Sequence, residues 1–392
     1  MDAPACQMPW IHLHVSNEGY VKACCVANIS FGNINDNTLD DIWNGDNIKK
    51  IRRQFLKGEL DKRCAVCLSV EASGGKSIRQ ETFEKFKISD NYEINNTALP
   101  IYYDIRFSNV CNFKCRTCWH GASSKWFSDA KILGNERGEK AIIKNIRDLE
   151  DFLTKVGPGL KQAEEIYFAG GEPLVTEEHY LLLQWLIDNG NTKVRLRYNS
   201  NFSKLQFKQY HVLRFWQKFQ NVEVMASIDA IGEHGELIRK EMIWEEILAN
   251  HFSIKNLPHV KFKISPTVSV LNIFHLTELY KYGVENKLIQ PMDFYFNMLE
   301  RPYHYNLKAM PENLKSKARA HYKVFENWMD QNDIPVEIVK GFRDCISFMD
   351  AEDKSNYWEK FKQETKLLDE IRGETLNLMV GAQNLPKKLE DS

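Results

Sequence analysis

The chain lacks any apolar run close to the roughly 18 residues that a membrane span needs, and its net charge is only −1. This balance gives no reason to expect bulk phosphate binding, so neither a membrane nor a nucleic acid is expected as partner. The opening residues, MDAPACQMPW, have no basic flank before an apolar core, so no signal peptide is expected. A cytoplasmic protein with reduced thiols is the resulting expectation.

Cysteine, in contrast, is abundant and grouped. Seven of the nine cysteines fall into two sets, and in a reducing compartment such sets indicate metal ligands rather than disulfides. Apolar residues make up 43% and charged residues 27% of the chain, as in a globular protein. The two sets are Cys111, Cys115 and Cys118, and Cys6, Cys24, Cys64 and Cys67.

From about residue 100, strand-like runs alternate with amphipathic helical stretches. The runs are IYYDIRF, EIYFAG, KVRLRY, VEVMAS, VKFKISPTVSV and MDFYFNM. One helical stripe is predicted from Ile142 to Leu153, and another between Thr176 and Gly190. The alternation predicts an α/β fold with a parallel sheet and outer helices. Six such units would form a partial (β/α)6 barrel of the TIM type.

The two flanks of this region differ from it. Residues 1–80 carry five cysteines among loops and short elements, and Thr38 with Asp41 indicates a capping box for a short helix. We expect an iron–sulfur domain at 1–80, a linker at 81–99, the barrel at 100–300 and a mainly helical extension at 301–392.

The loop CNFKCRTCWHG follows the first strand-like run and spaces its cysteines as C-x3-C-x2-C. Four protein ligands are normal for a tetrahedral metal or a four-iron cluster, and the next cysteine downstream is Cys345. Zinc ribbons and bacterial ferredoxins use other spacings. On the triplet alone, a zinc or redox loop stays an alternative.

On these residues the chain resembles the radical S-adenosylmethionine (SAM) superfamily, whose signature is C-x3-C-x2-C after the first strand. The resemblance implies that Cys111, Cys115 and Cys118 bind three irons of a [4Fe–4S] cluster and that SAM chelates the fourth. The family usually has an aromatic residue where this chain has Thr117. Trp119 or Phe113 would then replace it.

Three more stretches follow the order of the family's SAM-binding motifs, and the fifth strand, around Pro266-Thr267-Val268, is expected to pack against adenine. AGGEP after the second strand resembles the GGEP motif, which binds the SAM amino group. YNSN ends the third strand, where relatives contact ribose, and SID ends the fourth, where a serine and an arginine hold the carboxylate. Singly, each has a plainer interpretation as a turn or a surface arginine. The implied SAM-binding residues are Gly170, Gly171, Glu172, Asn199, Ser200, Ser227, Asp229, Arg239 and Val268.

The N-terminal cysteines have the layout C-x17-C-x39-C-x2-C. With GYVKAC and DIWN between them, they resemble the twitch domain, a shorter SPASM domain that binds one auxiliary [4Fe–4S] cluster. In most relatives this domain follows the barrel, whereas here it precedes it. Cys25 competes with Cys24 as ligand, and a structural zinc site is the alternative. Four cysteine ligands imply electron transfer or structural support rather than substrate binding.

The resemblance implies reductive cleavage of SAM to a 5′-deoxyadenosyl radical that abstracts hydrogen from a substrate. We expect a small, carbohydrate-like or other small-molecule substrate that is oxidised, with the auxiliary cluster as electron acceptor and flavodoxin or ferredoxin as electron donor. No catalytic acid or base is assigned. A SPASM/twitch-type peptide or protein maturase is the alternative, and a non-catalytic iron–sulfur or zinc protein a remote one.

Two smaller features complete the expectations. Asp104 and Arg106 alternate with apolar neighbours on the first strand, which suggests an ion pair inside the barrel near substrate. Cys345 stands alone in a helical region, where a buried packing role is expected.

Overall fold

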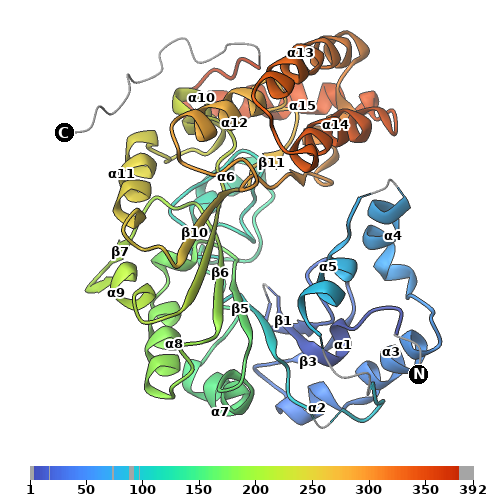
Figure 1. Cartoon of the computed structure of the whole chain (residues 1–392), viewed down its shortest axis with the longest axis vertical. Coiled ribbons are helices and arrows are strands. Elements are labelled where there is room, and N and C mark those ends of the chain that lie inside the picture. The colour runs from blue at the N-terminus through green and yellow to red at the C-terminus, as the bar shows by residue number, and fades with distance from the viewer. Residues whose placement is uncertain (1–3, 17, 73–74, 88–91, 97, 379–392) are drawn as a thin grey trace. The chain divides into compact units, whose positions relative to one another are not determined.

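The computed structural model describes residues 4–16, 18–72, 75–87, 92–96 and 98–378, which form two compact units (Figure 1). Within these residues, no helix has the length and apolar character of a membrane span. The first unit comprises Met1–Val110, Ile142–Tyr198 and Gln206–Val222, and the second Cys111–Ala141, Asn199–Leu205 and Glu223–Ser392.

The first unit is built on a sheet with the strand order β6-β5-β4-β1-β2-β3. Strands β1, β4, β5 and β6 are parallel, and β2 and β3 continue the sheet as an antiparallel hairpin. A strand of the cysteine-rich N-terminal segment therefore extends the parallel sheet directly. The strands are β1 (His12–Val15), β2 (Tyr20–Lys22), β3 (Ser30–Asn33), β4 (Tyr102–Ile105), β5 (Glu165–Phe168) and β6 (Arg195–Ser200), with the short pair β7 (Gln206–Phe207) and β8 (Tyr210–His211).

Helices of the first unit begin where the sequence supplies caps. Thr38 and Asp41 form the predicted capping box. The stripe predicted from Ile142 is wrong at its start, because Asp148 accepts hydrogen bonds from the first-turn N–H groups and so starts the helix at Leu149. The helices are α1 (Met8–Ile11), α2 (Leu39–Trp43), α3 (Asp46–Leu56), α4 (Ala65–Ala72), α5 (Ile78–Lys85), α7 (Leu149–Leu160), α8 (Glu177–Asp188) and α9 (Val212–Trp216).

One face of this sheet is an apolar core under α7 and α8. A Cβ on Gly159 of α7 would lie 1.9 Å from the Tyr103 hydroxyl, so only glycine lets this helix approach β4 so closely. His179 of α8 packs edge-on against the rings of Phe168 and Tyr198. Apolar side chains buried in this way each stabilise the fold by about 1.5–3 kcal/mol.

The segment predicted as a linker contains ordered structure. Helix α5 overlaps its first residues, and Phe86 and Tyr92 are buried. Trp10 donates a hydrogen bond from Nε1 to the carbonyl of Glu93 at 2.7 Å. Residues 88–91 and 97 of the segment lie outside the described residues.

The second unit continues the alternation of strands and helices and ends in a helical region. Its strands are β9 (Asn221–Ala226), β10 (Val260–Ile264), β11 (Thr267–Val268) and β12 (Asn297–Met298), where β12 is shorter than the predicted MDFYFNM strand. Its helices are α6 (Phe127–Leu133), α10 (Gly232–Ile238), α11 (Trp244–Ile254), α12 (Leu276–Glu285), α13 (Glu312–Gln331), α14 (Val336–Asp350) and α15 (Trp358–Arg372). The α/β fold with a parallel sheet and a helical C-terminal region is confirmed, and Cys345 is fully buried.

Candidate functional site

The three-cysteine loop opens the second unit. The Cys118 N–H donates to the Cys115 carbonyl at 3.0 Å, and the Phe113 N–H points at the Cys111 sulfur at 3.4 Å. Burial raises the pKa of the Cys118 thiol to about 12, and the neighbouring Cys115 adds to this effect. Neighbouring thiolates repel one another, and a bound cationic metal would relieve that repulsion.

An arginine and an aspartate adjoin the middle cysteine. Arg239 Nη1 lies 3.7 Å from the Cys115 sulfur, while its Nε lies 2.9 Å from Asp229 Oδ2. The Thr267 N–H donates to Asp229 Oδ1 at 2.7 Å, so the carboxylate is held from two sides. A guanidinium beside a thiol favours the thiolate, which is the form that binds metal.

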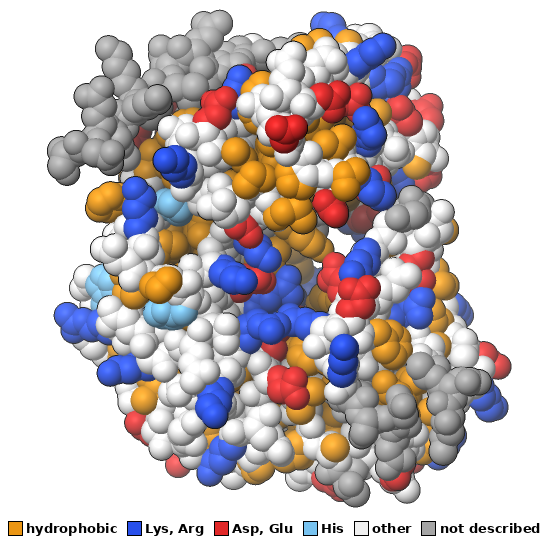
Figure 2. Space-filling view, in the orientation of Figure 1, with side chains coloured by type: hydrophobic (Ala, Val, Ile, Leu, Met, Phe, Trp, Pro, Cys, Tyr) orange, Lys and Arg blue, Asp and Glu red, His pale blue; other side chains and the backbone are white. Residues whose placement is uncertain are grey.

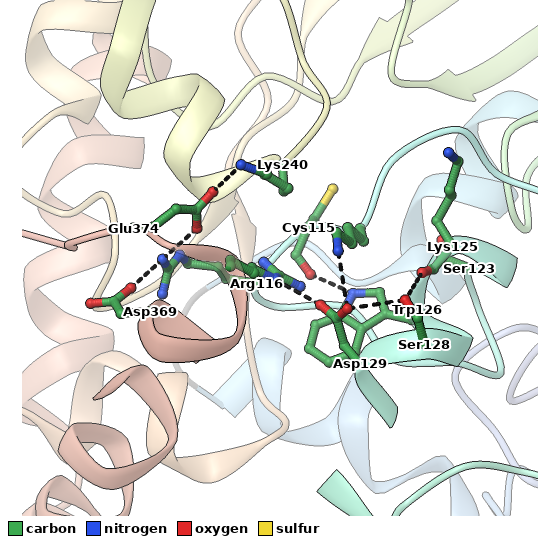
Figure 3. Close-up of polar contacts among 12 residues, drawn as sticks. Cys115, Arg116, Ser123, Lys125, Trp126, Ser128, Asp129, Lys240, Asp369 and Glu374 are labelled. Atoms are coloured by element: carbon green, nitrogen blue, oxygen red, sulfur yellow. Dashed lines mark hydrogen bonds and ion pairs between the residues drawn. The ribbon is translucent and has the colours of Figure 1, made fainter. Parts of the chain in front are cut away.

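The same loop is clamped by charged side chains near the C-terminal helix. The Arg116 side chain is fully buried, and Figure 3 shows it pointing toward Asp369 and Glu374. Its Nη2 lies 2.8 Å from Glu374 Oε2 and also donates to Asp369. Its Nε donates to the Leu237 carbonyl at 3.1 Å. Arg116 therefore connects the residues between two cysteines to the end of α15.

A second set of contacts supports this clamp. Asp129 accepts from Lys114 at 3.0 Å and from Arg372 at 2.8 Å. Trp126 donates from Nε1 to the Cys115 carbonyl at 2.8 Å, as drawn in Figure 3. The Arg372 guanidinium lies 4.9 Å from the centre of the Trp126 ring. The loop conformation is thus fixed by protein contacts at several points.

The turn after β5 lies in the first unit, against the backbone that leads into the cysteine loop. Gly170 and Gly171 both have positive φ, +77° and +53°. A Cβ on Gly171 would lie 2.2 Å from the Val110 carbonyl oxygen. The Glu172 N–H donates to that oxygen at 2.7 Å, and its buried carboxylate accepts from the Leu174 N–H at 3.0 Å. Both glycines are therefore required by the backbone itself.

Polar groups after β6 contact the cysteine loop. Asn201 Nδ2 donates to Asn112 Oδ1 at 2.9 Å, and Asn112 Nδ2 donates to Ser203 Oγ at 2.8 Å. Asn199 Oδ1 is buried and makes no hydrogen bond within the described residues. A buried acceptor without a donor is costly, so this oxygen fits a bound hydroxyl.

The remaining predicted residues are placed as follows. Ser200 Oγ accepts from the Phe202 N–H at 2.9 Å, and the Ser227 N–H donates to the Ser200 carbonyl at 2.8 Å. Val268 is fully buried in the β11–β12 pair. In the second unit, Arg239 thus contacts both Cys115 and Asp229.

The N-terminal cysteines form a second group in the first unit. Cys6, Cys24 and Cys67 are buried, and Cys64 is half-buried. Burial raises the pKa of Cys6, and the nearby Cys24, Cys67 and Cys64 raise it further. Cys24 receives hydrogen bonds from two backbone N–H groups, and Cys67 from a backbone N–H and the Ser77 hydroxyl. Buried thiols that interact and accept N–H bonds fit the ligands of an iron–sulfur cluster.

Cys25 has different surroundings from its neighbour. It is exposed, and its electrostatic partners are Asp104 and Arg106 as well as Cys24. Cys24, in contrast, interacts with Cys67 and Cys64. No three His, Cys, Asp or Glu side chains among the described residues already meet as metal ligands, so the fit rests on burial, charge and hydrogen bonds.

Sequence reasoning missed the contacts that fix the loop. The position of Arg116 between Cys115 and Cys118 was a signal in the sequence that it could act on the loop. Its acidic partners could not be identified, because they lie more than 250 residues away. His14 was also missed: its Nδ1 lies 2.7 Å from Asp104 Oδ2. The predicted ion pair of Asp104 with Arg106 is present, at 3.2 Å.

Comparison with known proteins identifies part of the chain. The family model of SPASM, an iron–sulfur cluster-binding domain, matches residues 6–68, which contain the four candidate ligands Cys6, Cys24, Cys64 and Cys67. The predicted SPASM- or twitch-type iron–sulfur domain is thereby confirmed. No curated protein sequence matches the chain.

Two solved structures are distantly similar to this chain. Native anSMEcpe with bound AdoMet and Cp18Cys peptide is 20% identical, with a TM-score of 0.39, over 59% of this chain and 61% of the other. Streptococcus suis SuiB bound to S-adenosylmethionine is 13% identical, with a TM-score of 0.38, over 74% and 63%. This chain spans less than two thirds of either protein. Likenesses this distant carry no inference about activity.

Proposed function

We propose that this chain, a radical SAM protein with a SPASM-type iron–sulfur domain near its N-terminus, is an enzyme that cleaves SAM reductively and removes hydrogen from a substrate. Cys111, Cys115 and Cys118 would hold a [4Fe–4S] cluster, and Cys6, Cys24, Cys64 and Cys67 the auxiliary [4Fe–4S] cluster. Bound together, the first cluster and SAM supply the 5′-deoxyadenosyl radical chemistry. The contact of Arg239 with both Cys115 and Asp229 carries this proposal.

The protein's own residues would position and shield the reactants. Gly170 and Gly171 allow close approach of the backbone, and Glu172 would accept from the SAM amino group. Asn199 would accept from a ribose hydroxyl, because its buried oxygen has no donor within the described residues. Arg239 would donate to the SAM carboxylate while Asp229 holds its guanidinium in place. The other proposed SAM contacts are Ser200, Ser227 and Val268.

For the substrate, we propose oxidation of a small molecule, with the auxiliary cluster accepting the second electron. A reduced flavodoxin or ferredoxin in the cytoplasm would supply the first electron. The proposed division is an iron–sulfur domain at 1–80, a linker at 81–99, the barrel at 100–300 and a helical extension at 301–392. Maturation of a peptide or protein by a SPASM/twitch-type enzyme is the second candidate, and the match of residues 6–68 to the SPASM domain supports it.

The test is release of 5′-deoxyadenosine by anaerobically purified protein given SAM and dithionite. Wild type and Cys345→Ala, which changes a cysteine outside both groups, should release it, whereas Cys115→Ala should lose at least a hundredfold of the rate. Equal release by Cys115→Ala, or no release by wild type with full iron content, would contradict the proposal. Gene neighbours distinguish the substrates: a short precursor peptide favours maturation, and sugar-modifying enzymes favour a small molecule.

A further inference from the structure

A row of polar side chains crosses four parallel strands of the first unit. The sheet register pairs His14 of β1 with Asp104 of β4, Asp104 with Tyr167 of β5, and Tyr167 with Arg197 of β6. Side chains at paired positions point to the same face of a sheet. The four residues therefore lie side by side on one face.

This face is the one that α7 and α8 leave uncovered. Adjacent residues on the same strands point to the other face. Tyr103, Phe168 and Tyr198 are examples, and they are fully buried against α7 and α8. Sheets of parallel strands normally bury apolar residues on both faces. A polar face that includes half-buried Tyr167 and Arg197 is therefore suited to contact a polar ligand.

The carboxylate in this row, that of Asp104, holds the Arg106 side chain in place. Asp104 is buried, and Arg106 donates to both of its oxygens, from Nε at 3.2 Å and from Nη2 at 3.3 Å. His14 contacts the same carboxylate from the other side at 2.7 Å. Although burial raises the pKa of Asp104, Arg106 and His14 outweigh this effect and hold it well below its ordinary value. Asp104 and Arg106 therefore both stay charged, and the half-buried Arg106 guanidinium is held in one orientation.

A second guanidinium stands across Tyr167 from the first. The Arg197 guanidinium lies 5.4 Å from the centre of the Tyr167 ring, and Tyr167 interacts electrostatically with both Arg106 and Arg197. Burial raises the pKa of Tyr167, so its hydroxyl remains a neutral hydrogen-bond donor. Figure 2 shows Lys and Arg side chains gathered near the centre of the view, where β5 and β6 lie in Figure 1.

The charge around the row is positive. Lys85 and Arg195 pair with Glu165 in the next row, and Arg197 also interacts with Glu81 of α5. Counting these neighbours, the cations Lys85, Arg106, Arg195 and Arg197 outnumber the carboxylates Glu81, Asp104 and Glu165. An anion between Arg106 and Arg197 would balance this excess.

We propose that this face binds the substrate through an oxyanion group, a carboxylate or a phosphate, held by Arg106, Arg197 and the Tyr167 hydroxyl. Asp104 and His14 are positioning residues that hold Arg106. The inference rests on the proposed function, because it assigns the substrate class of the same enzyme. A planar guanidinium is suited to both groups, since each presents two oxygens to its fork.

The test uses inorganic phosphate and succinate as separate probes of full-length, cluster-loaded protein at low ionic strength, with binding followed by calorimetry. Arg106→Gln and Arg197→Gln should each weaken binding of the preferred probe about tenfold, the loss expected for a charge-assisted hydrogen bond. Arg197→Lys should recover part of the affinity. Arg214→Gln, which removes an exposed arginine of α9, is the matched control and should bind as wild type does. The tighter probe tells whether the group is phosphate or carboxylate.

A second measurement keeps this inference separate from the proposed function. Iron content and SAM cleavage without substrate should be unchanged in the control Arg214→Gln, which removes an exposed arginine outside the polar face. If wild type cleaves SAM but Arg106→Gln, Arg197→Gln and Arg214→Gln bind both probes equally, the oxyanion site is refuted and the proposed function stands. If the arginine variants lose probe binding but wild type does not cleave SAM, the proposed function fails and the anion site stands.

Discussion

Arg116 Nη2 lies 2.8 Å from Glu374 Oε2, and this contact connects the loop between two candidate cluster ligands to the residues that follow α15. The arginine side chain is fully buried, whereas the carboxylates of Glu374 and Asp369 are 9% and 16% exposed. The helical C-terminal region therefore helps to set the conformation of the cysteine loop.

Removing this arginine should destabilise the loop. Arg116→Ala leaves two carboxylates without their buried partner, so we expect a loss of about 3 kcal/mol in unfolding free energy, at the low end for buried pairs because the carboxylates are partly exposed. Iron bound by the three-cysteine loop should fall with it. Lys125→Ala, an exposed change in the same segment, should cost less than about 0.5 kcal/mol. Anaerobic urea unfolding and iron analysis measure both; an unchanged Arg116→Ala protein would show that the clamp has no such role.

Cys24 and Cys25 should differ as ligands although they are adjacent. Cys24 interacts with Cys64 and Cys67, whereas Cys25 interacts with Asp104 and Arg106. We therefore expect Cys24→Ala to lower iron from about eight to about four per chain, the content of one four-iron cluster. Cys25→Ala should keep both clusters. Iron and sulfide analysis of the two variants decides, and the reverse result would assign the ligand to Cys25.

The glycine turn should tolerate no side chain at Gly171. Its φ is +53°, and an added Cβ would lie 2.2 Å from the Val110 carbonyl oxygen. Gly190→Ala is the matched control, because its φ is +77° but nothing lies within 4 Å of the added atom. The unfolding free energy of the control should fall by about 1–2 kcal/mol, because alanine is strained in the left-handed backbone conformation. That of Gly171→Ala should fall by about 1–3 kcal/mol more, because of the clash. SAM affinity should fall only in Gly171→Ala; equal stability and affinity in both variants would contradict the assignment.

Stability should fall in acid partly because of His179. Burial lowers the pKa of this side chain to about 3, below the ordinary 6.5. Protonation thus favours the unfolded chain, so stability is lost as pH falls below 6.5, by about 1.4 kcal/mol per pH unit down to the folded pKa. His179→Leu should reduce the loss between pH 6 and pH 4 by about 2–3 kcal/mol in urea unfolding. Tyr198→Phe, which removes only the hydrogen-bond partner at 3.0 Å, should keep the wild-type slope; an unchanged slope in His179→Leu would contradict the prediction.

The sequence predicted the features that depend on local pattern. Alternating strands and helices, the capping box of Thr38 and Asp41, and the cysteine spacings are all readable within short windows. The helix start was misplaced because the apolar stripe at Ile142 was weighed above the Asp148 cap. Local signals can compete, and the hydrogen bonds at the helix end decided between them.

Long-range pairing could not be predicted from the sequence. The β1–β4 ladder joins residues about 90 positions apart, and the Arg116 clamp spans more than 250. No periodicity records which strand lies next to which, so the row from His14 to Arg197 becomes visible only in the sheet register. The candidate cluster ligands could be predicted from sequence motifs, whereas the side chains that hold the ligand loop in place could not.

The most direct test of the central claim is Mössbauer spectroscopy of the iron-57-loaded Cys24→Ala protein, which should hold only the cluster of the three-cysteine loop. Adding SAM should change the signal of one iron in four, because three cysteines leave one iron for the amino and carboxylate groups of SAM. A spectrum that SAM leaves unchanged, with all four irons equivalent and protein-ligated, would contradict the account.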